Sequence, residues 1–419
     1  MEYLHLFKTK AERNYFYNNV NKYKEPCLAR TLDNTLDNAL VTGNRLYDYS
    51  KDYFTIEALG DGTITITIPS NLNSTYATSL SYSKDKSNWT ETVIDNTLQT
   101  ITINVLGGEQ VYLKGIARQL YNGNDGENSD GVRINSTANI NVFGNIMSLL
   151  YEDDFEDKTV FPNGSQYTFS YLFNSNTHLV NAENLILPVM ELTYKCYSLM
   201  FWGCSSLITA PVLPATKLTT DCYYFMFGKT ALINAPVLPA TKMASGCYKF
   251  MFDNCTSLVT APELPATVLA DYCYQDMFRG CSSLKIAPAL PATELTNTCY
   301  KELFRLCTSL VAAPELPATT LASDCYRGMF YGCSSLENAP ILNATVLTTN
   351  CYRYMFNGCS KLNSITMLAT DISASSCLDN WVSGVAATGT FTKAKSMTSL
   401  PTGNNGIPEG WTVVDYTAA

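Results

Sequence analysis

Cysteine is the residue type with the most chemical potential in this sequence. Of 15 cysteines among 419 residues, all but Cys27 fall into two regular series in the C-terminal half. The first series recurs every 26 residues, with one interval of 25, and consists of Cys196, Cys222, Cys247, Cys273, Cys299, Cys325, Cys351 and Cys377. The second follows eight residues later in most repeats and consists of Cys204, Cys255, Cys281, Cys307, Cys333 and Cys359. Such thiols could bind metal, form disulfides or pack as small apolar side chains.

Metal binding and disulfide formation both fit this pattern poorly. Zinc sites need cysteine pairs at short spacing, often with histidines, and the only histidines are His5 and His178. The polar loop at 122–131 lacks the ligand spacing of an EF-hand, which favours a solvated loop over a calcium site. Disulfides between neighbouring repeats stay open, although they would use alternate repeats and an odd total leaves one thiol unpaired. The pattern favours buried, stacked thiols, and we expect no metal and no cofactor.

The chain has few residues arranged as catalytic groups are. Two histidines leave almost no candidate for a histidine base. The strongest catalytic alternative is a pair of carboxylates on a repeat array, as in polysaccharide depolymerases. Glu263 and Glu315 occupy equivalent repeat positions, but Ala289 intervenes, so the two carboxyls would lie about 10 Å apart. We therefore interpret the scattered acids as solvating charges and expect no enzymatic activity.

Composition narrows the remaining function classes. Hydrophobic residues make up 46% of the chain, aromatic residues 12% and charged residues 16%, which is typical of a folded protein. The formal charge of -9, without any run of Lys or Arg, argues against nucleic-acid binding. No stretch approaches 18 consecutive apolar residues, and the first 24 residues lack the pattern of a secretion signal, so we expect neither membrane insertion nor export by such a signal.

The regular cysteines belong to a repeated unit that predicts a solenoid. Each unit reads roughly C-Y-x-x-M-F-x-G-C-S-S-L-x-x-A-P-x-L-P-A-T-x-L. A coil of this length cannot bury its own apolar side, so stacked coils must align like residues into internal ladders. We place inside the coil the Cys, Met and Phe, the Leu of S-S-L, the Ala of A-P, the Leu of L-P and the Leu five residues beyond it. The prolines predict short strands and a narrow sheet.

One repeat is a residue shorter than the others. In the repeat that begins at Cys222, Met226-Phe227-Gly228-Lys229 is followed by Thr230 instead of cysteine. We read the deletion as lying before Lys229, which would put Lys229 at the position of the second cysteine series.

The sequence before the repeats changes to a period of two. Thr63 to Ile68 alternates threonine with isoleucine, and the runs 79–83, 100–106 and 110–114 alternate in the same way. Alternation with polar turns between the runs predicts a small antiparallel β-sandwich. We therefore divide the chain into an N-terminal anchor segment at 1–50, a β-sandwich at 51–120, a linker and solenoid cap at 121–170, the solenoid at 171–382 and a C-terminal cap at 383–419.

The first 50 residues have little apolar core of their own. Thr9 and Glu12 form a capping-box pattern that predicts a short helix. Such an aromatic segment could order against a partner, or it could pack as an arm on its own sandwich. Residues proposed for a partner contact are Tyr3, Leu6, Phe7, Tyr15, Phe16 and Tyr17.

The repeat positions that vary are candidates for ligand binding. The two residues after C-Y and the residue after M-F change from coil to coil, while the ladder positions do not. Exposed aromatics beside arginine suit a sugar ring or a protein partner, because the ring stacks and the polar group orients the ligand. Packing on neighbouring coils is the competing interpretation. The candidates are Trp202, Tyr224, Phe225, Arg279, Arg327, Tyr331, Arg353 and Tyr354.

The repeated unit resembles a known family. The run C-Y-x-x-M-F-x-G-C-S-S-L followed by L-P-A-T, as in 325–345, is similar to BspA-type leucine-rich repeats of surface proteins from gut Bacteroidetes and of virion proteins from their phages, including crAss-like phages. The resemblance covers about 170–382, and 144–150 and 389–413 look like its end caps. It implies a mainly β fold with short helical segments, in which an N-terminal anchor and a small antiparallel β-sandwich precede a BspA-type solenoid of 26-residue coils.

The resemblance also implies two locations for this chain. The first is the virion surface, as a head or tail fibre or decoration that docks on virion structural proteins through its N-terminal segment and binds host-surface glycan or protein through its solenoid. The second is the bacterial cell surface, as an adhesin, which would need an export signal. By analogy with such fibres we expect a homo-oligomer such as a trimer.

Overall fold

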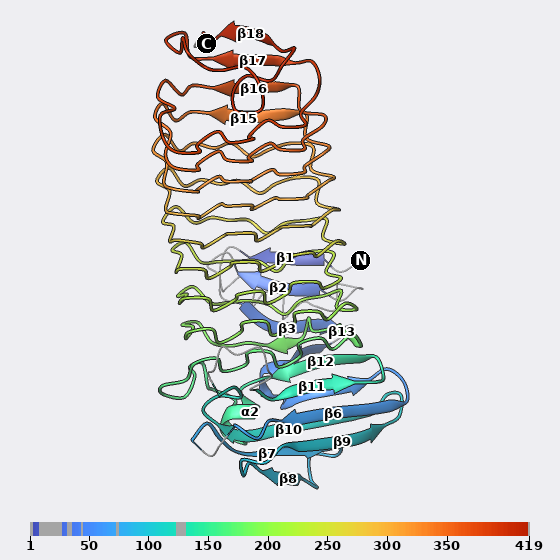
Figure 1. Cartoon of the computed structure of the whole chain (residues 1–419). Helices are drawn as coiled ribbons and strands as arrows, with labels where there is room; N and C mark the ends of the chain where they lie inside the picture. The colour runs from blue at the N-terminus through green and yellow to red at the C-terminus, as the bar shows by residue number, and fades with distance from the viewer. Residues whose placement is uncertain are drawn as a thin grey trace.

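The computed structural model describes residues 3–7, 27–31, 36–42, 45–72, 75–122 and 131–417. The fold is mainly β with short helical segments, which confirms the predicted fold class, and its coils stack between a β-sandwich and the strands β15–β18 (Figure 1). The strands before the solenoid are β1 (Tyr3–Phe7), β2 (Cys27–Thr31), β3 (Leu36–Thr42), β4 (Arg45–Asp48), β5 (Phe54–Ala58), β6 (Gly62–Ile68), β7 (Ala77–Ser83), β8 (Thr90–Val93), β9 (Gln99–Val105), β10 (Gln110–Ala117), β11 (Arg133–Ser136) and β12 (Ile140–Asn145). The solenoid strands are β13 (Leu179–Asn181), β14 (Leu185–Ile186), β15 (Asn338–Leu342), β16 (Ser364–Met367), β17 (Thr390–Lys393) and β18 (Thr412–Asp415). The helical segments are η2 (Tyr49–Lys51) and α2 (Ser148–Tyr151).

The N-terminal segment contains a four-stranded sheet in the order β1-β2-β3-β4, with β1 and β2 parallel. Sequence patterning did not predict these strands. Tyr3, Leu6 and Phe7 lie on β1, but their side chains are outside the described part of the structure. Thr9, Glu12, Tyr15, Phe16 and Tyr17 lie outside the described residues, as does 123–130 of the polar loop. Across the described residues, no helix is long and apolar enough to cross a membrane.

Two packed sheets form the β-sandwich. One has the order β13-β12-β5-β10-β7-β8, and the other has the order β11-β6-β9. Alternation explains the packing, because Ile64, Ile66 and Ile68 of β6 are fully buried while the threonines between them are half-buried. Phe54 and Ile56 of β5 complete the facing layer of the core.

The sandwich continues into the solenoid through β12. This strand pairs antiparallel with β5 and parallel with β13 and β14, so one strand joins the two units. Only glycine fits at position 144 of this joining strand, because φ there is +81° and an added Cβ would lie 2.1 Å from the Tyr53 carbonyl oxygen. The domain boundaries proposed above assign β11 and β12 to the linker and cap, and the structure pairs both strands with the sandwich.

The solenoid has a narrow parallel sheet, as the prolines predicted. Strands β15 to β18 pair in parallel at its C-terminal end. Earlier coils are connected on this side by isolated bridges such as Asn234 to Thr260 and Ile286 to Ala312. Proline removes backbone donors within each A-P-x-L-P run, which limits the ladder to these few bonds.

Internal ladders fill the coils. The phenylalanines from Phe173 to Phe356 stack with ring centroids 5.3–5.8 Å apart. The Cys, Met, Phe and S-S-L leucine positions predicted to be inside have no exposed surface in most coils. A tyrosine ladder was not predicted: the Tyr of each C-Y pair is also buried and stacks on its neighbours, and it comprises Tyr197, Tyr223, Tyr248, Tyr274, Tyr300, Tyr326 and Tyr352.

The structure buries another alanine of the repeat more deeply than the one assigned to the core. The Ala of A-P, such as Ala210, is only half-buried, whereas the Ala of P-A-T, such as Ala215, is 1% exposed. Extended backbone alternates its side chains, so Ala215 shares the inward face with Leu213. Ala210 lies an odd number of residues from Leu213, so it is off the inward face and packs against the edge of the core.

The short coil is also arranged differently from our prediction. Thr230, at 4% exposure, takes the place of the second cysteine, and its Oγ1 lies 2.8 Å from the Phe227 carbonyl oxygen and 3.2 Å from Cys255 Sγ. Lys229 is exposed and has the left-handed φ of +59° that Asn254 shows in the next coil. The deletion therefore falls in the turn between Thr230 and Leu232, and both of these residues keep their buried positions in the internal ladders.

The cysteines of the two series are free thiols, so disulfides between neighbouring repeats do not occur in this structure. In the second series, each thiol donates a hydrogen bond to the phenylalanine carbonyl of the preceding coil. Examples are Cys281 to Phe252 at 3.2 Å and Cys307 to Phe278 at 3.1 Å. These bonds give a buried polar atom a partner and tie adjacent coils together.

Candidate ligand-binding face

The C-Y-x-x-M-F-x-G segment of each coil presents a face to solvent. Every fourth residue has a left-handed backbone, as at Asp221, Phe225 and Lys229 with φ of 53°, 52° and 59°. Backbone N–H groups alternate between the next coil and the same coil: Leu199 donates to the Tyr224 carbonyl, whereas Met200 donates to that of Tyr197. Two side chains point inward, and the next two lie on what we call the variable face.

Hydrogen bonds between coils hold the left-handed residues of this face in place. A left-handed conformation costs a non-glycine residue about 1 kcal/mol, and the hydrogen bonds of adjacent coils offset that cost. Side chains on the variable face therefore project from a backbone that neighbouring coils fix on both sides. Such preorganisation favours binding, because little conformational entropy is lost when a ligand arrives.

Four of the eight predicted ligand-binding residues meet in one hollow. Trp202, Tyr224, Phe225 and Arg279 are half-buried and line a space of about 430 Å³ near the sandwich end of the solenoid. We call this space the tryptophan hollow. Its remaining lining comes from Tyr171, Leu199, Lys229, Asp253 and Asn254.

A second hollow adjoins the first and was not predicted. It has a volume of about 380 Å³ and shares Tyr171, Leu199 and Tyr224 with the tryptophan hollow. We call it the tyrosine hollow, and we call the two together the aromatic groove. Its other lining residues are Tyr121, Tyr167, Lys195, Ser198, Asp221 and Lys249. Both volumes fall within the range of small-molecule sites.

Aromatic rings and cations alternate through the aromatic groove. Tyr121 stacks on Tyr167 and on Tyr171, with centroids 5.4 Å apart in both pairs. Lys229 Nζ lies 4.5 Å from the Trp202 ring, and Lys249 Nζ lies 5.9 Å from the Tyr224 ring. A groove of this kind can pack a flat ligand face against its rings and bind polar groups with its ammonium ions.

Gly228 makes space for the indole of Trp202. It occupies the position of Asp253 and Arg279 in the following coils, directly after the ladder phenylalanine. A Cβ added there would lie 2.8 Å from Trp202 Cδ1 and 3.2 Å from Phe225 Cδ1. The indole of Trp202 therefore fits only because the equivalent position of the next coil is a glycine.

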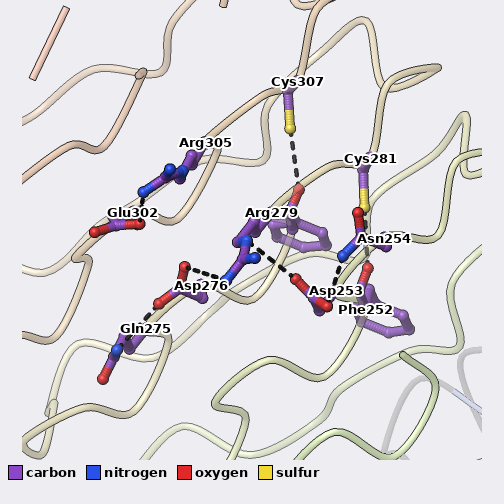
Figure 2. Close-up of polar contacts among 11 residues, drawn as sticks. Phe252, Asp253, Asn254, Gln275, Asp276, Arg279, Cys281, Glu302, Arg305 and Cys307 are labelled. Carbon is purple, nitrogen blue, oxygen red and sulfur yellow. Dashed lines mark hydrogen bonds and ion pairs between the residues drawn. The ribbon is translucent and has the colours of Figure 1, made fainter. Parts of the chain in front are cut away.

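From the edge of the aromatic groove onward, the variable face carries paired charges. Figure 2 shows Arg279 between the carboxyls of Asp253 and Asp276, with nitrogen–oxygen distances of 3.5 Å and 4.0 Å. Arg305 donates to Glu302 at 2.6 Å. These acids and arginines partner one another within and between coils, which satisfies much of the charge on this part of the surface.

Two of these acids are buried, and burial changes their titration. Asp276 is 3% exposed, and burial, followed by the negative charge of Glu302, raises its pKa to about 7. The amide of Gln275, which donates to Asp276 Oδ2 at 3.0 Å, acts in the opposite direction. Burial likewise raises the pKa of Asp253. Asp276 thus changes charge near neutral pH.

The other four predicted ligand-binding residues lie in later coils, away from the aromatic groove. Arg327 donates to Asp324 at 3.1 Å. The ring of Tyr331 lies 4.7 Å from the guanidinium of Arg305. Arg353 lies over the ring of Tyr354 at 5.0 Å. These contacts are local, and the structure does not bring the four residues together around a hollow.

A third hollow lies on the sheet side of the solenoid. It has a volume of about 600 Å³ and a mostly apolar lining, to which Ile286, which is 72% exposed, contributes together with Glu263. Among the described residues, no group of three or more His, Cys, Asp or Glu side chains is arranged to hold a metal ion.

The sequence signals for the aromatic groove were incomplete because part of its lining comes from residues before the regular repeats. Tyr167 and Tyr171 come from the first, atypical coil, and Tyr121 precedes the polar loop. The atypical first coil was the one available signal. Lys249 occupies a repeat position that varies, but the sequence does not show that it lies near the rings of Tyr224, Phe250 and Tyr272.

No protein-family model, curated protein or solved structure matches this chain. Its function therefore has to be inferred from the geometry of the variable face and the aromatic groove.

Proposed function

We propose that this chain is a non-enzymatic adhesion protein that binds a host-surface glycan or protein in the aromatic groove. The observation that carries the proposal is the meeting of half-buried rings and cations around two adjoining hollows on a preorganised face. Rings offer stacking surface at low entropic cost, and nearby charges orient a polar ligand. A surface on which residues vary without changing the ladders is suited to recognition.

We further propose that the chain is a BspA-type phage virion surface protein, a head or tail fibre or decoration. Support comes from the resemblance of its repeats and from a solenoid of 26-residue coils that follows a β-sandwich. In this proposal the N-terminal segment docks on virion structural proteins, and the protein acts as a homo-oligomer. A bacterial cell-surface adhesin is the alternative that uses the same groove.

Binding to whole bacterial cells tests the adhesion proposal. Tyr224 lines both hollows, so Tyr224→Ala should reduce cell binding at least tenfold, in line with the loss of a central aromatic contact. Tyr331→Ala is the matched control, because Tyr331 lies on the same face but outside the groove, and it should leave binding unchanged. Equal binding by wild type and Tyr224→Ala would contradict the proposal.

The location is tested by antibodies against the solenoid. Labelling of purified phage particles supports the virion proposal, whereas labelling confined to the envelope of uninfected bacteria supports the adhesin. Sedimentation of the full chain measures whether it is an oligomer.

A further inference from the structure

Two lysines of the aromatic groove have no ion-pair partner among the described residues. The salt bridges of that part of the chain include neither Lys229 nor Lys249. Asp253, whose carboxyl Lys229 influences, is within 3.5 Å of Arg279 instead. Both ammonium groups are therefore available for an anion that comes from outside the chain.

Aromatic rings hold these ammonium groups at the groove. Lys249 Nζ lies 5.9 Å, 5.6 Å and 5.3 Å from the ring centroids of Tyr224, Phe250 and Tyr272. Lys229 Nζ lies 4.5 Å from that of Trp202. A ring attracts an ammonium ion but accepts few of its hydrogen bonds, so N–H donors remain for a ligand oxygen.

The charge of the groove differs in sign from that of the chain. Its lining contains four cationic side chains, Lys195, Lys229, Lys249 and Arg279, and two acidic ones, Asp221 and Asp253. Of the two acids, Asp253 already has a cationic neighbour, because its Oδ1 lies 3.5 Å from Arg279 Nε. The whole chain carries -9, which disfavours a long polyanion such as nucleic acid but not a short ligand bound in a local cationic site.

We propose that the aromatic groove binds an acidic oligosaccharide, with its carboxylates held by Lys229 and Lys249 and its sugar rings packed against Tyr224 and Trp202. Because Tyr224 is a wall of both hollows, neighbouring sugar units occupy the two hollows on either side of its ring. This inference rests on the proposed adhesion function and adds the chemical class of the ligand. Charge-assisted hydrogen bonds to the carboxylates give selectivity over a neutral sugar of the same shape.

A panel of matched oligosaccharides tests this ligand class. The full chain is titrated with oligomers of galacturonate, glucuronate and sialic acid, and with the methyl ester of each, which keeps the ring and removes the charge. We expect an acidic oligomer to bind at least tenfold more tightly than its ester. We also expect the difference to shrink as salt rises from 0.05 to 0.5 M, because the lysines are partly open to solvent.

Lysine variants locate the contact. Lys229→Gln and Lys249→Gln should each weaken binding of the acidic oligomer about fivefold to tenfold and leave binding of the ester unchanged. Lys301→Gln is the matched control, because Lys301 occupies the repeat position of Lys249 two coils away. Tyr224→Ala should weaken binding of both forms. Thermal unfolding of each variant shows that the fold is intact.

The outcomes separate this inference from the adhesion proposal. If the chain binds cells through the groove but prefers neutral oligosaccharides or binds no acidic member of the panel, the ligand class is wrong and the adhesion proposal stands. If Lys301→Gln weakens binding as much as Lys249→Gln, the contact lies outside the groove. If Tyr224→Ala has no effect on cells, both proposals fail.

Discussion

Replacing Asp276 with asparagine should stabilise the solenoid, and more so at alkaline pH. Asp276 is 3% exposed, and its Oδ1 has no hydrogen-bond donor among the described residues, although Arg279 Nη1 lies 4.0 Å away. Gln275 donates to the other oxygen. Asparagine keeps an acceptor for Gln275, carries no charge and readily adopts the left-handed φ of 53° found at this position.

The size of the effect follows from the pKa. Burial raises the pKa of Asp276 from the ordinary 3.8 to about 7 in the fold, so folding favours the protonated form. The contribution of this group to stability is therefore fully present below pH 3.8 and is lost as the pH rises through 7. Each pKa unit corresponds to about 1.4 kcal/mol, which sets an upper limit of about 4 kcal/mol on the loss. We expect the advantage of Asp276→Asn over wild type to be about 2 kcal/mol larger at pH 8.5 than at pH 5.

Urea unfolding at the two pH values, followed by tryptophan fluorescence, measures this difference. Asp324→Asn is the control of opposite sign. Although burial, the largest influence, acts to raise the pKa of Asp324, hydrogen bonds from Arg327, Asn350 and Ser323 together lower it. Asp324→Asn should therefore destabilise the fold at neutral pH. A stability gain from Asp276→Asn that is the same at pH 5 and pH 8.5 would refute the reasoning, because it would show that the carboxyl does not titrate in this range.

Three further predictions concern packing. Phe278→Ala removes a ring stacked between Phe252 and Phe304 and should destabilise the solenoid by about 3–5 kcal/mol in urea unfolding; a loss below 1 kcal/mol would show that the ladder collapses around the gap. Thr230→Val removes the hydroxyl that contacts the Phe227 carbonyl and Cys255 and should cost about 1–2 kcal/mol, with Thr230→Ser retaining most of the stability. Gly228→Ala places a Cβ 2.8 Å from Trp202 and should shift the tryptophan emission and weaken cell binding, while the free energy of unfolding changes by no more than about 1 kcal/mol. An unchanged spectrum and unchanged binding would contradict the role of this glycine.

Repetition made the ladders predictable. Residues that recur at every coil while their neighbours vary must meet their own copies, and this argument located the buried Cys, Met and Phe positions and the leucines of S-S-L and L-P. The leucine five residues beyond L-P was also placed inside, but it is only half-buried in coils such as those of Leu218 and Leu295. Alternation in β6 was equally informative. The isoleucines form one face of the strand and the threonines the other, so only the isoleucine face can pack against the core.

Backbone geometry was the part that the sequence did not predict. Cys222 and Tyr223 are adjacent in the sequence, and both side chains point inward. A strand would place adjacent side chains on opposite faces, and a helix would not repeat such pairs at a period of four. A left-handed residue at every fourth position makes such pairs possible. Some of these positions hold residues such as Leu199 and Phe225, which have no propensity that indicates this conformation. The aromatic groove was predicted only in part for a different reason. Tyr121 stacks on Tyr171 because of the path of the chain between them, which the spacing of residues does not encode.

The buried free thiols allow separation of the coils to be detected by chemical labelling. Most coils carry two buried cysteines, and burial suppresses their reactivity, raising the pKa of Cys255 to about 11 and that of Cys299 to about 12. A coil that separates from its neighbours exposes its thiols to an alkylating reagent, and the added mass is permanent. Mass spectra collected during partial unfolding would therefore count the opened coils in each molecule, and peptide maps would show from which end the rod comes apart.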